Sequence, residues 1–164
     1  MEKNFSHLSE SSKVWIYQSN RLLSNEEVIQ AKEILAQFVS EWASHGEKVN
    51  DGGAVLYNLF IVLAADETNV SVGGCSIDSS VHCIREIEKA CEISLFDRFN
   101  IAFKDDGEVK LANRSQFQQM LIEGKLDEES IVFNNLVSTK QEFTGEWEVP
   151  LKQSWHHKLF SIPA

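Results

Sequence analysis

The residues best suited to chemistry lie in one short segment, Gly73-Gly74-Cys75-Ser76-Ile77-Asp78, which precedes a predicted helix. Glycines let backbone N–H groups approach a ligand closely, and the N-terminus of a helix favours anions. The segment therefore predicts a ligand-binding turn formed by Gly73, Gly74, Ser76 and Asp78. The competing interpretation is a structural turn in which Ser76 or Asp78 caps the helix and the cysteine is an inert core residue.

A nucleophilic cysteine is a second possible use of the same segment. Cys75 would lie at the start of the helix, where the partial positive charge of the helix dipole favours a thiolate. His82 follows seven residues later, and Asp66 ends a predicted strand. Either side chain would be a candidate general base. This hypothesis predicts a catalytic set of Cys75, His82 and Asp66.

The sequence gives no indication of a metal or cofactor site. Cys75, Cys83 and Cys91 recur every eight residues, which on a helix turns successive side chains by about 80° and scatters them around the axis. The phosphate-binding pattern GxxxxGK[ST], the dinucleotide-binding pattern GxGxxG and the hydrolase patterns HExxH and GxSxG are all missing. We therefore expect no metal and no cofactor, and the common enzymes that carry these motifs are excluded.

Charge and cysteine content restrict the partners and the compartment. The formal net charge is −10, with 15 basic and 25 acidic residues, which opposes binding to nucleic acid and to anionic membranes. The longest apolar run, residues 59–65, is too short to cross a bilayer. Three cysteines without a CxxC pair indicate reduced thiols. We expect a cytoplasmic protein with no nucleic-acid partner and no membrane insertion.

The hydrophobic pattern predicts alternating strands and helices after a polar, Ser-rich and mobile segment at residues 1–12. Ser24 and Glu27 form a capping box that starts a helix, which Gly46 would end. Asp51-Gly52-Gly53 predicts a turn. Further elements are strands at 14–17, 54–66 and 131–137, a helix at 79–91, a hairpin around Asp106-Gly107 and a C-terminal helix at 151–159.

These elements predict an α+β or α/β fold, with a single mixed β-sheet flanked by three to four helices. The chain of 164 residues suits one domain, which we place at residues 13–164, with a possible C-terminal sub-region at 104–160.

Aromatic residues in the C-terminal part indicate a binding role. Phe133, Trp147 and Trp155 would form an aromatic surface for an unidentified protein or peptide partner. Because the standard catalytic motifs are missing, a non-catalytic partner- or ligand-binding domain is favoured over a small enzyme or sensor built on Cys75 and His82.

Four segments carry a resemblance to a known family: VWIYQSNR at 14–21, GCSID with SVH at 74–82, VFNNLV at 132–137, and WEVPL with SWH at 147–156. With these segments the chain resembles a small uncharacterised bacterial protein family loosely labelled "ABC transporter ATPase". The resemblance covers about residues 13–160. Its label implies an association with an ABC transporter, but no Walker motif is present to carry ATP hydrolysis, and the resemblance implies no catalytic residues.

A second resemblance concerns residues 107–155. Here a strand, a short helix, the pattern Leu126-x-x-x-x-Ile131-Val132-Phe133 and a later Trp155 are similar to GYF-like peptide-binding modules. This resemblance implies recognition of an extended peptide on an aromatic patch.

Overall fold

The computed structural model describes residues 5–96 and 98–163, which fold into two units. Unit 1 contains residues 5–96 together with residues 138–144, and unit 2 contains residues 98–137 together with residues 145–163. Unit 1 is therefore discontinuous in sequence.

The sheet of unit 1 is built around one buried strand. β5 (Phe60–Asp66) is buried at every position except its last. It pairs antiparallel with β1 (Lys13–Gln18) on one side and with β4 (Asn50–Leu56) on the other, which gives the order β1-β5-β4. The continuous apolar sequence of β5 matches this position, because a central strand covered on both faces needs no polar side.

The predicted single strand at 54–66 is wrong in its extent, because the chain reverses inside it. Tyr57 and Asn58 have φ values of 55° and 53°, and this left-handed pair turns β4 into β5. Asn tolerates that conformation, but Tyr gives no local indication of it. The predicted turn at Asp51-Gly52-Gly53 is also wrong, since these residues lie within β4.

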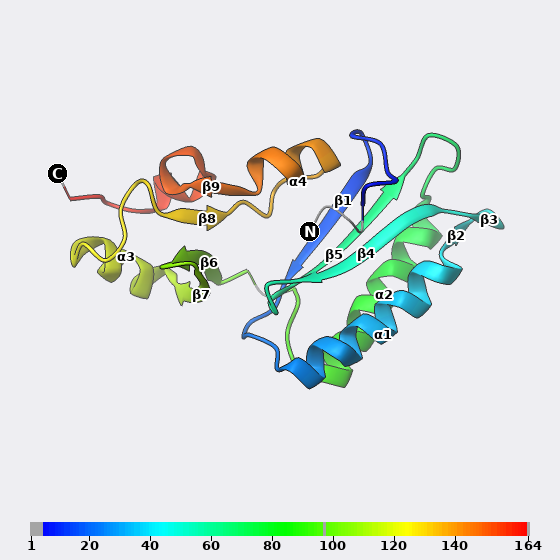
Figure 1. Cartoon of the computed structure of the whole chain (residues 1–164), viewed down its shortest axis with the longest axis horizontal. Helices are drawn as coiled ribbons and strands as arrows, with labels where there is room; N and C mark the ends of the chain where they lie inside the picture. Colours follow the sequence, from blue (N-terminus) through cyan, green and yellow to red (C-terminus); the bar gives the residue numbers. More distant parts are fainter. Residues whose placement is uncertain (1–4, 97, 164) are drawn as a thin grey trace. The chain divides into compact units, whose positions relative to one another are not determined.

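Two antiparallel helices cover one face of this sheet (Figure 1). α1 (Asn25–Glu41) begins with the predicted Ser24–Glu27 capping box, which is confirmed. α2 (Gly74–Cys91) begins at Gly74 rather than at Ser79. Their inner faces pack on strand β5 in one core, which contains Ala31, Leu35, Ile61, Leu63, Ile84 and Ile87.

A short hairpin and one tryptophan tie the two helices together at one end. β2 (Ala43–Ser44) pairs with β3 (Glu47–Lys48). Gly46 makes the turn between them with φ 80°, so its predicted role as a helix cap is wrong. Trp42, where α1 ends, is 2% exposed, and its indole N–H donates to the carbonyl of Ser76 in α2 at 2.9 Å.

The segment expected to be mobile at residues 1–12 can be followed from Phe5, since residues 1–4 lie outside the described part of the chain. Phe5 and Leu8 are buried. Phe5 packs edge-on against Phe143 of α4 (Lys140–Glu146), with ring centroids 5.9 Å apart. Lys140 donates to the carbonyl of Leu8 at 2.8 Å.

Unit 2 is a four-stranded antiparallel sheet with one α-helix and two short 3-10 helices. Its strands are β6 (Asn100–Asp105), β7 (Glu108–Asn113), β8 (Ile131–Phe133) and β9 (Glu148–Pro150), in the order β7-β6-β8-β9. The predicted hairpin is confirmed, with Asp106 and Gly107 both at positive φ between β6 and β7. The helix α3 (Arg114–Ile122) follows β7. The predicted helix at 151–159 is instead η2 (Leu151–Gln153) and η3 (Trp155–Leu159).

The fold is α+β, as predicted, but the single mixed sheet is wrong. The described residues form three antiparallel sheets of three, two and four strands, with four α-helices. Where the sequence predicted one long strand, a hairpin forms. Every strand pairing among the described residues runs antiparallel. Three of these pairs, β2–β3, β4–β5 and β6–β7, are hairpins in which a short connection reverses the chain direction.

We expect Trp42→Ala to lower the free energy of unfolding by about 3–5 kcal/mol, because it removes a large buried side chain. Trp42→Phe keeps most of the apolar contact but removes the indole hydrogen bond to the Ser76 carbonyl, and should cost about 1 kcal/mol. Urea unfolding followed by circular dichroism measures both values. A loss below about 1 kcal/mol for Trp42→Ala would contradict the role of Trp42 in joining α1 to α2.

Candidate functional site

The predicted ligand-binding turn is the first part of helix α2, and much of it is used by the fold. Gly73 is the N-cap residue and supplies no side-chain hydrogen bond, and its N–H donates to the hydroxyl of Ser44 at 3.4 Å. Ser76 is buried and its hydroxyl donates to the carbonyl of Ala43 at 2.8 Å. Gly74 and Asp78 are exposed. Gly73 and Ser76 thus hold α2 against the β2–β3 hairpin.

The three predicted catalytic side chains have separate surroundings. Cys75 is exposed in the first turn of α2, and His82 is seven residues further along the same helix, which corresponds to about 10 Å of axial rise. Direct proton transfer needs a hydrogen bond of about 3 Å. His82 instead pairs with Glu86, with 3.3 Å between Nε2 and Oε1. Cys75 and His82 therefore do not form a hydrogen-bonded pair along this helix.

Asp66, at the end of β5, is held by hydrogen bonds to neighbouring residues. Its carboxylate accepts hydrogen bonds from the Thr68 hydroxyl and from the amides of Thr68 and Ser9. These bonds, the one from the Thr68 hydroxyl first, lower the pKa of the Asp66 carboxyl. Because a lower pKa makes a carboxylate a weaker base, this environment does not favour a general base.

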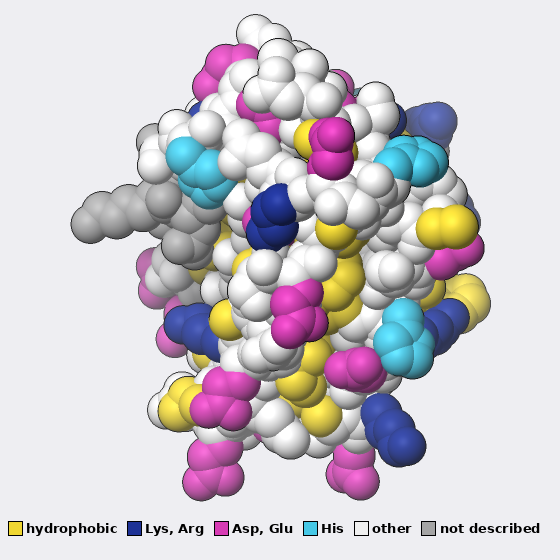
Figure 2. Space-filling view, turned by 90° about the vertical axis from the view of Figure 1, so that its right-hand side faces the viewer, with side chains coloured by type: hydrophobic (Ala, Val, Ile, Leu, Met, Phe, Trp, Pro, Cys, Tyr) yellow, Lys and Arg dark blue, Asp and Glu magenta, His cyan; other side chains and the backbone are white. Residues whose placement is uncertain are grey.

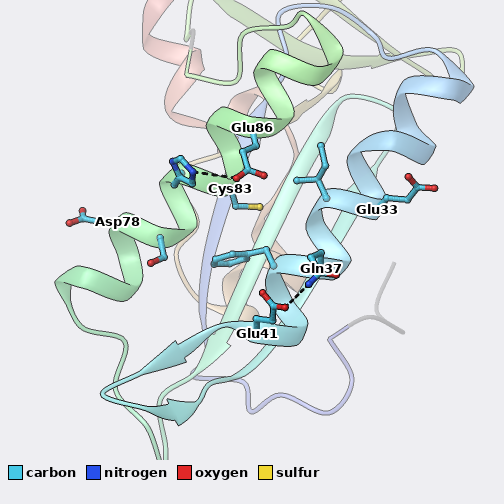
Figure 3. A pocket seen from close by; sticks show the side chains of 10 residues that line it. Glu33, Gln37, Glu41, Asp78, Cys83 and Glu86 are labelled. Carbon is cyan, nitrogen blue, oxygen red and sulfur yellow. Dashed lines mark hydrogen bonds and ion pairs between the residues drawn. The ribbon is translucent and has the colours of Figure 1, made fainter.

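A groove runs between α1 and α2 on the side of the helix pair that faces away from the sheet (Figure 3). It has a volume of about 710 Å³. The apolar lining comes from Ile34 and Phe38 of α1 and from Cys83 of α2. The polar lining comes from Glu33, Gln37, Glu41, Asp78, Ser79, His82 and Glu86.

The groove is strongly acidic. Four carboxylates line it, and no Lys or Arg is among its lining residues in the described part of the chain. Figure 3 shows Glu41 and Glu86 beside the groove, with Glu33 and Asp78 directed outward on its two sides. In Figure 2 the same face of the molecule carries a stripe of hydrophobic side chains with acidic side chains on both sides. The arrangement can hold an apolar group between rows of negative charge.

The positions of the groove residues follow a regular spacing in the sequence. Glu33, Gln37 and Glu41 are four residues apart on α1, and Asp78, His82 and Glu86 are four residues apart on α2. Residues at this spacing lie on one face of a helix. Asp78 and His82 were predicted from the sequence as candidate site residues, but as parts of a turn and of a catalytic pair. The row of residues on α1 and the groove were not predicted.

The thiol in the groove is not a reactive group. Cys83 is 3% exposed. Burial first, and the neighbouring charge of Glu86 second, raise the pKa of the Cys83 thiol to about 12. Since the thiolate is the nucleophile, a thiol with this pKa remains protonated and inert at neutral pH. Cys83 therefore contributes apolar surface to the groove.

The three aromatic residues predicted to bind a partner do not form one surface. Phe133 and Trp147 are buried and pack edge to face, with 4.9 Å between ring centroids. The Trp147 indole N–H donates to the side chain of Asn135 at 2.9 Å. Trp155 is 39% exposed. Two of the three rings predicted to form the surface are therefore buried, and Trp155 is the accessible one of the three.

The ring of Trp155 stacks on His156, with centroids 3.9 Å apart. His156 is buried, and its Nδ1 lies 2.6 Å from the hydroxyl of Ser154. Burial lowers the pKa of His156 from 6.5 to about 4. The imidazole is therefore neutral in the folded protein at neutral pH, and with Ser154 it forms a buried polar contact.

Comparison of the chain with protein-family models, with curated proteins and with solved structures gave no match. Within residues 5–96 and 98–163, no three His, Cys, Asp or Glu side chains are placed to hold a metal ion. The helices in that part of the chain are also too short or too polar to traverse a lipid bilayer.

The cysteines should differ in reactivity according to their burial. We expect iodoacetamide to modify Cys75 in the native protein, while Cys83 and Cys91 react only after unfolding. Burial raises the pKa of both inner thiols, and both residues are buried. Peptide mapping by mass spectrometry locates the label, with urea-unfolded protein and Cys75→Ser as controls. Native labelling of Cys83 as fast as that of Cys75 would show that the groove is open down to Cys83.

The neutral His156 should make stability depend on pH. Above pH 6.5 the imidazole is neutral in both the folded and the unfolded chain, so its stabilisation is complete. Between pH 6.5 and about 4 the unfolded chain binds a proton that the folded chain does not. The free energy of unfolding then falls by at most about 1.4 kcal/mol per pH unit from this group.

Urea unfolding across this pH range tests the expectation with His156→Gln and, as a matched control, His157→Gln at the more exposed neighbouring position. The His156→Gln variant should lose part of the pH dependence, whereas the control keeps it. If the free energy of unfolding depended equally on pH in both variants, the dependence would arise from carboxylates elsewhere and not from His156.

Proposed function

We propose that the protein is a non-catalytic binding domain that docks a cationic segment of a partner protein in the groove between α1 and α2. The observation that carries this proposal is the apolar lining of the groove between rows of carboxylates, with no Lys or Arg among the lining residues in the described part of the chain. An interface core that is apolar and a rim that is charged are typical of protein recognition sites.

The shape of the groove favours an amphipathic helix as the docked segment. The first and last residues of each polar row are eight positions apart, which is about 12 Å along a helix axis. Two antiparallel helices offer a third helix a hollow in which its apolar side chains contact Ile34 and Phe38. Lys and Arg side chains on both sides of that apolar stripe would then lie near Glu41 and Glu86. Recognition of an amphipathic helix by such a groove is a common mode of peptide binding.

The hydrogen bonds of the candidate catalytic residues support a binding role over an enzymatic one. His82 is paired with Glu86, and Asp66 is held by Thr68 and Ser9. The resemblance to the family labelled "ABC transporter ATPase" suggests that the partner protein is associated with an ABC transporter. This part of the proposal depends on the four sequence segments that carry the resemblance.

A synthetic amphipathic peptide tests the groove. The probe is an amidated helix of about 14 residues, with Leu at helical spacing and Lys elsewhere, and its matched control has Glu in place of Lys. Fluorescence anisotropy should show binding of the Lys peptide alone, weaker at high salt. Reversing the two charges beside the groove, Glu41→Lys with Glu86→Lys, should weaken binding at least about tenfold, which corresponds to about 1.4 kcal/mol.

The matched control variant carries the same change of net charge elsewhere, Glu108→Lys with Glu128→Lys, two exposed carboxylates of unit 2. It should bind the Lys peptide within about twofold of the unmodified protein, a difference below 0.5 kcal/mol. If both double variants lose affinity equally, the peptide responds to the net charge of −10 and the groove is not the docking site. Phe38→Ala should also weaken binding, since it removes apolar contact at constant charge.

A further inference from the structure

The sheet of unit 1 ends on one side at β4, and this edge has hydrogen-bonding groups without a strand partner. β4 pairs with β5 alone in the described part of the chain. The carbonyl of Asp51 accepts a hydrogen bond from the imidazole of His7 at 2.7 Å. A carbonyl that meets a group outside the sheet points away from β5.

The direction of the Asp51 carbonyl fixes the direction of its neighbours. In an antiparallel pair, residues alternate between those that bond to the partner strand and those whose N–H and C=O both point away. Gly53 and Val55 follow Asp51 at intervals of two, so their N–H and C=O groups also point to the free edge. Both residues are partly accessible.

A second groove lies beside this edge, between α1 and β4. It has a volume of about 340 Å³ and is lined by Lys32, Leu35, Ala36, Val39, Gly53, Ala54 and Val55. Gly53 allows the helix to come close, because a Cβ atom there would lie 2.9 Å from Cγ of Leu35. Leu35 fills the space at Gly53, and the small side chain of Ala36 leaves room in the groove for a side chain that enters from the edge. Lys32 is the one charged residue of this lining.

The opposite edge of the same sheet already accepts a further extended segment. Residues 138 and 139 lie against β1, where the Val14 amide donates to the carbonyl of Ser138 at 2.9 Å and Lys13 forms a β-bridge with Thr139. One edge is thus covered by the chain's own backbone, while β4 offers the equivalent groups to another chain. Exposed edges of this kind are sites of strand addition.

We propose that β4 binds an extended segment of a partner protein as an added strand. The backbone of this segment bonds to Gly53 and Val55, a small or medium apolar side chain enters beside Ala36 and Val39, and an acidic residue lies near Lys32. This inference goes beyond the proposed function, because it concerns the other side of α1 and a different kind of partner segment.

A backbone substitution separates strand addition from every side-chain effect. Val55→Pro removes the outward N–H, and proline is tolerated in an edge strand where the N–H faces solvent. Val55→Thr keeps the N–H and a β-branched side chain, and is the matched control. A phage-displayed library of random ten-residue peptides is selected on the unmodified full chain, and enriched peptides are synthesised and measured by calorimetry. Circular dichroism and urea unfolding confirm that both variants are folded.

We expect enriched peptides that contain an acidic residue beside an apolar one, bind at least tenfold more weakly to Val55→Pro, and bind within twofold to Val55→Thr. Bound peptide should also slow amide hydrogen exchange at Gly53 and Val55 in the unmodified protein, a readout that does not depend on any variant. Several outcomes would overturn strand addition by a partner. These are the absence of any enriched peptide, unchanged exchange at both amides, and a dimer of this chain that Val55→Pro dissociates. Strand addition would also be contradicted if the enriched peptides bound more weakly to the Glu41→Lys, Glu86→Lys variant but equally well to Val55→Pro. That result would instead support the groove between α1 and α2 as their binding site.

Discussion

The hydrogen bond from the Trp42 indole to the Ser76 carbonyl determines how the rest of unit 1 is arranged. It joins the end of α1 to the first turn of α2 at a buried position, and the Ser76 hydroxyl extends the same contact to Ala43. A buried indole N–H must find a partner, and the Ser76 carbonyl supplies it. The bond therefore requires the end of α1 to lie beside the first turn of α2, which agrees with the antiparallel arrangement in which the carboxylates of α1 lie opposite those of α2.

The two sides of α1 line different grooves, because the helix lies over an edge of the sheet. Leu35 packs on Gly53 so closely that a side chain at position 53 would meet it, which leaves Lys32, Ala36 and Val39 beside the free edge of β4. The other side of α1, with Glu33 and Glu41, faces α2. One helix thus separates an acidic groove from a groove beside β4, whose outer edge has no strand partner in the described part of the chain.

Local chemistry was predictable from the sequence, and pairing between distant segments was not. The Ser24–Glu27 capping box and the Asp106-Gly107 turn depend on residues within one turn of chain, and both were predicted. The turn at Tyr57-Asn58 was missed because Tyr does not favour positive φ, so β4 and β5 were merged into one strand. Gly53 was assigned to a turn, although its role depends on Leu35, which lies in α1.

The residues of the candidate site could likewise be predicted only where the pattern lies within one segment of the chain. The spacing of four between Asp78, His82 and Glu86 is visible in the sequence, but the matching row on α1 has meaning only when the helices are side by side. Phe133 and Trp147 were expected at the surface because aromatic residues are common there. A strand of three residues is too short to show which of its faces is buried, and the Asn135 acceptor that lets the Trp147 N–H be buried cannot be identified from sequence spacing alone.

The discontinuity of unit 1 has a consequence for synthesis on the ribosome. Residues 138–144 complete unit 1, and they are made only after residues 98–137, which belong to unit 2. At about 5–20 residues per second, the ribosome needs about 2–10 s to extend the nascent chain from residue 96 to residue 144. During that interval β1 lacks the segment that bonds to Val14, so both edges of the first sheet are open to other chains in the translating cell.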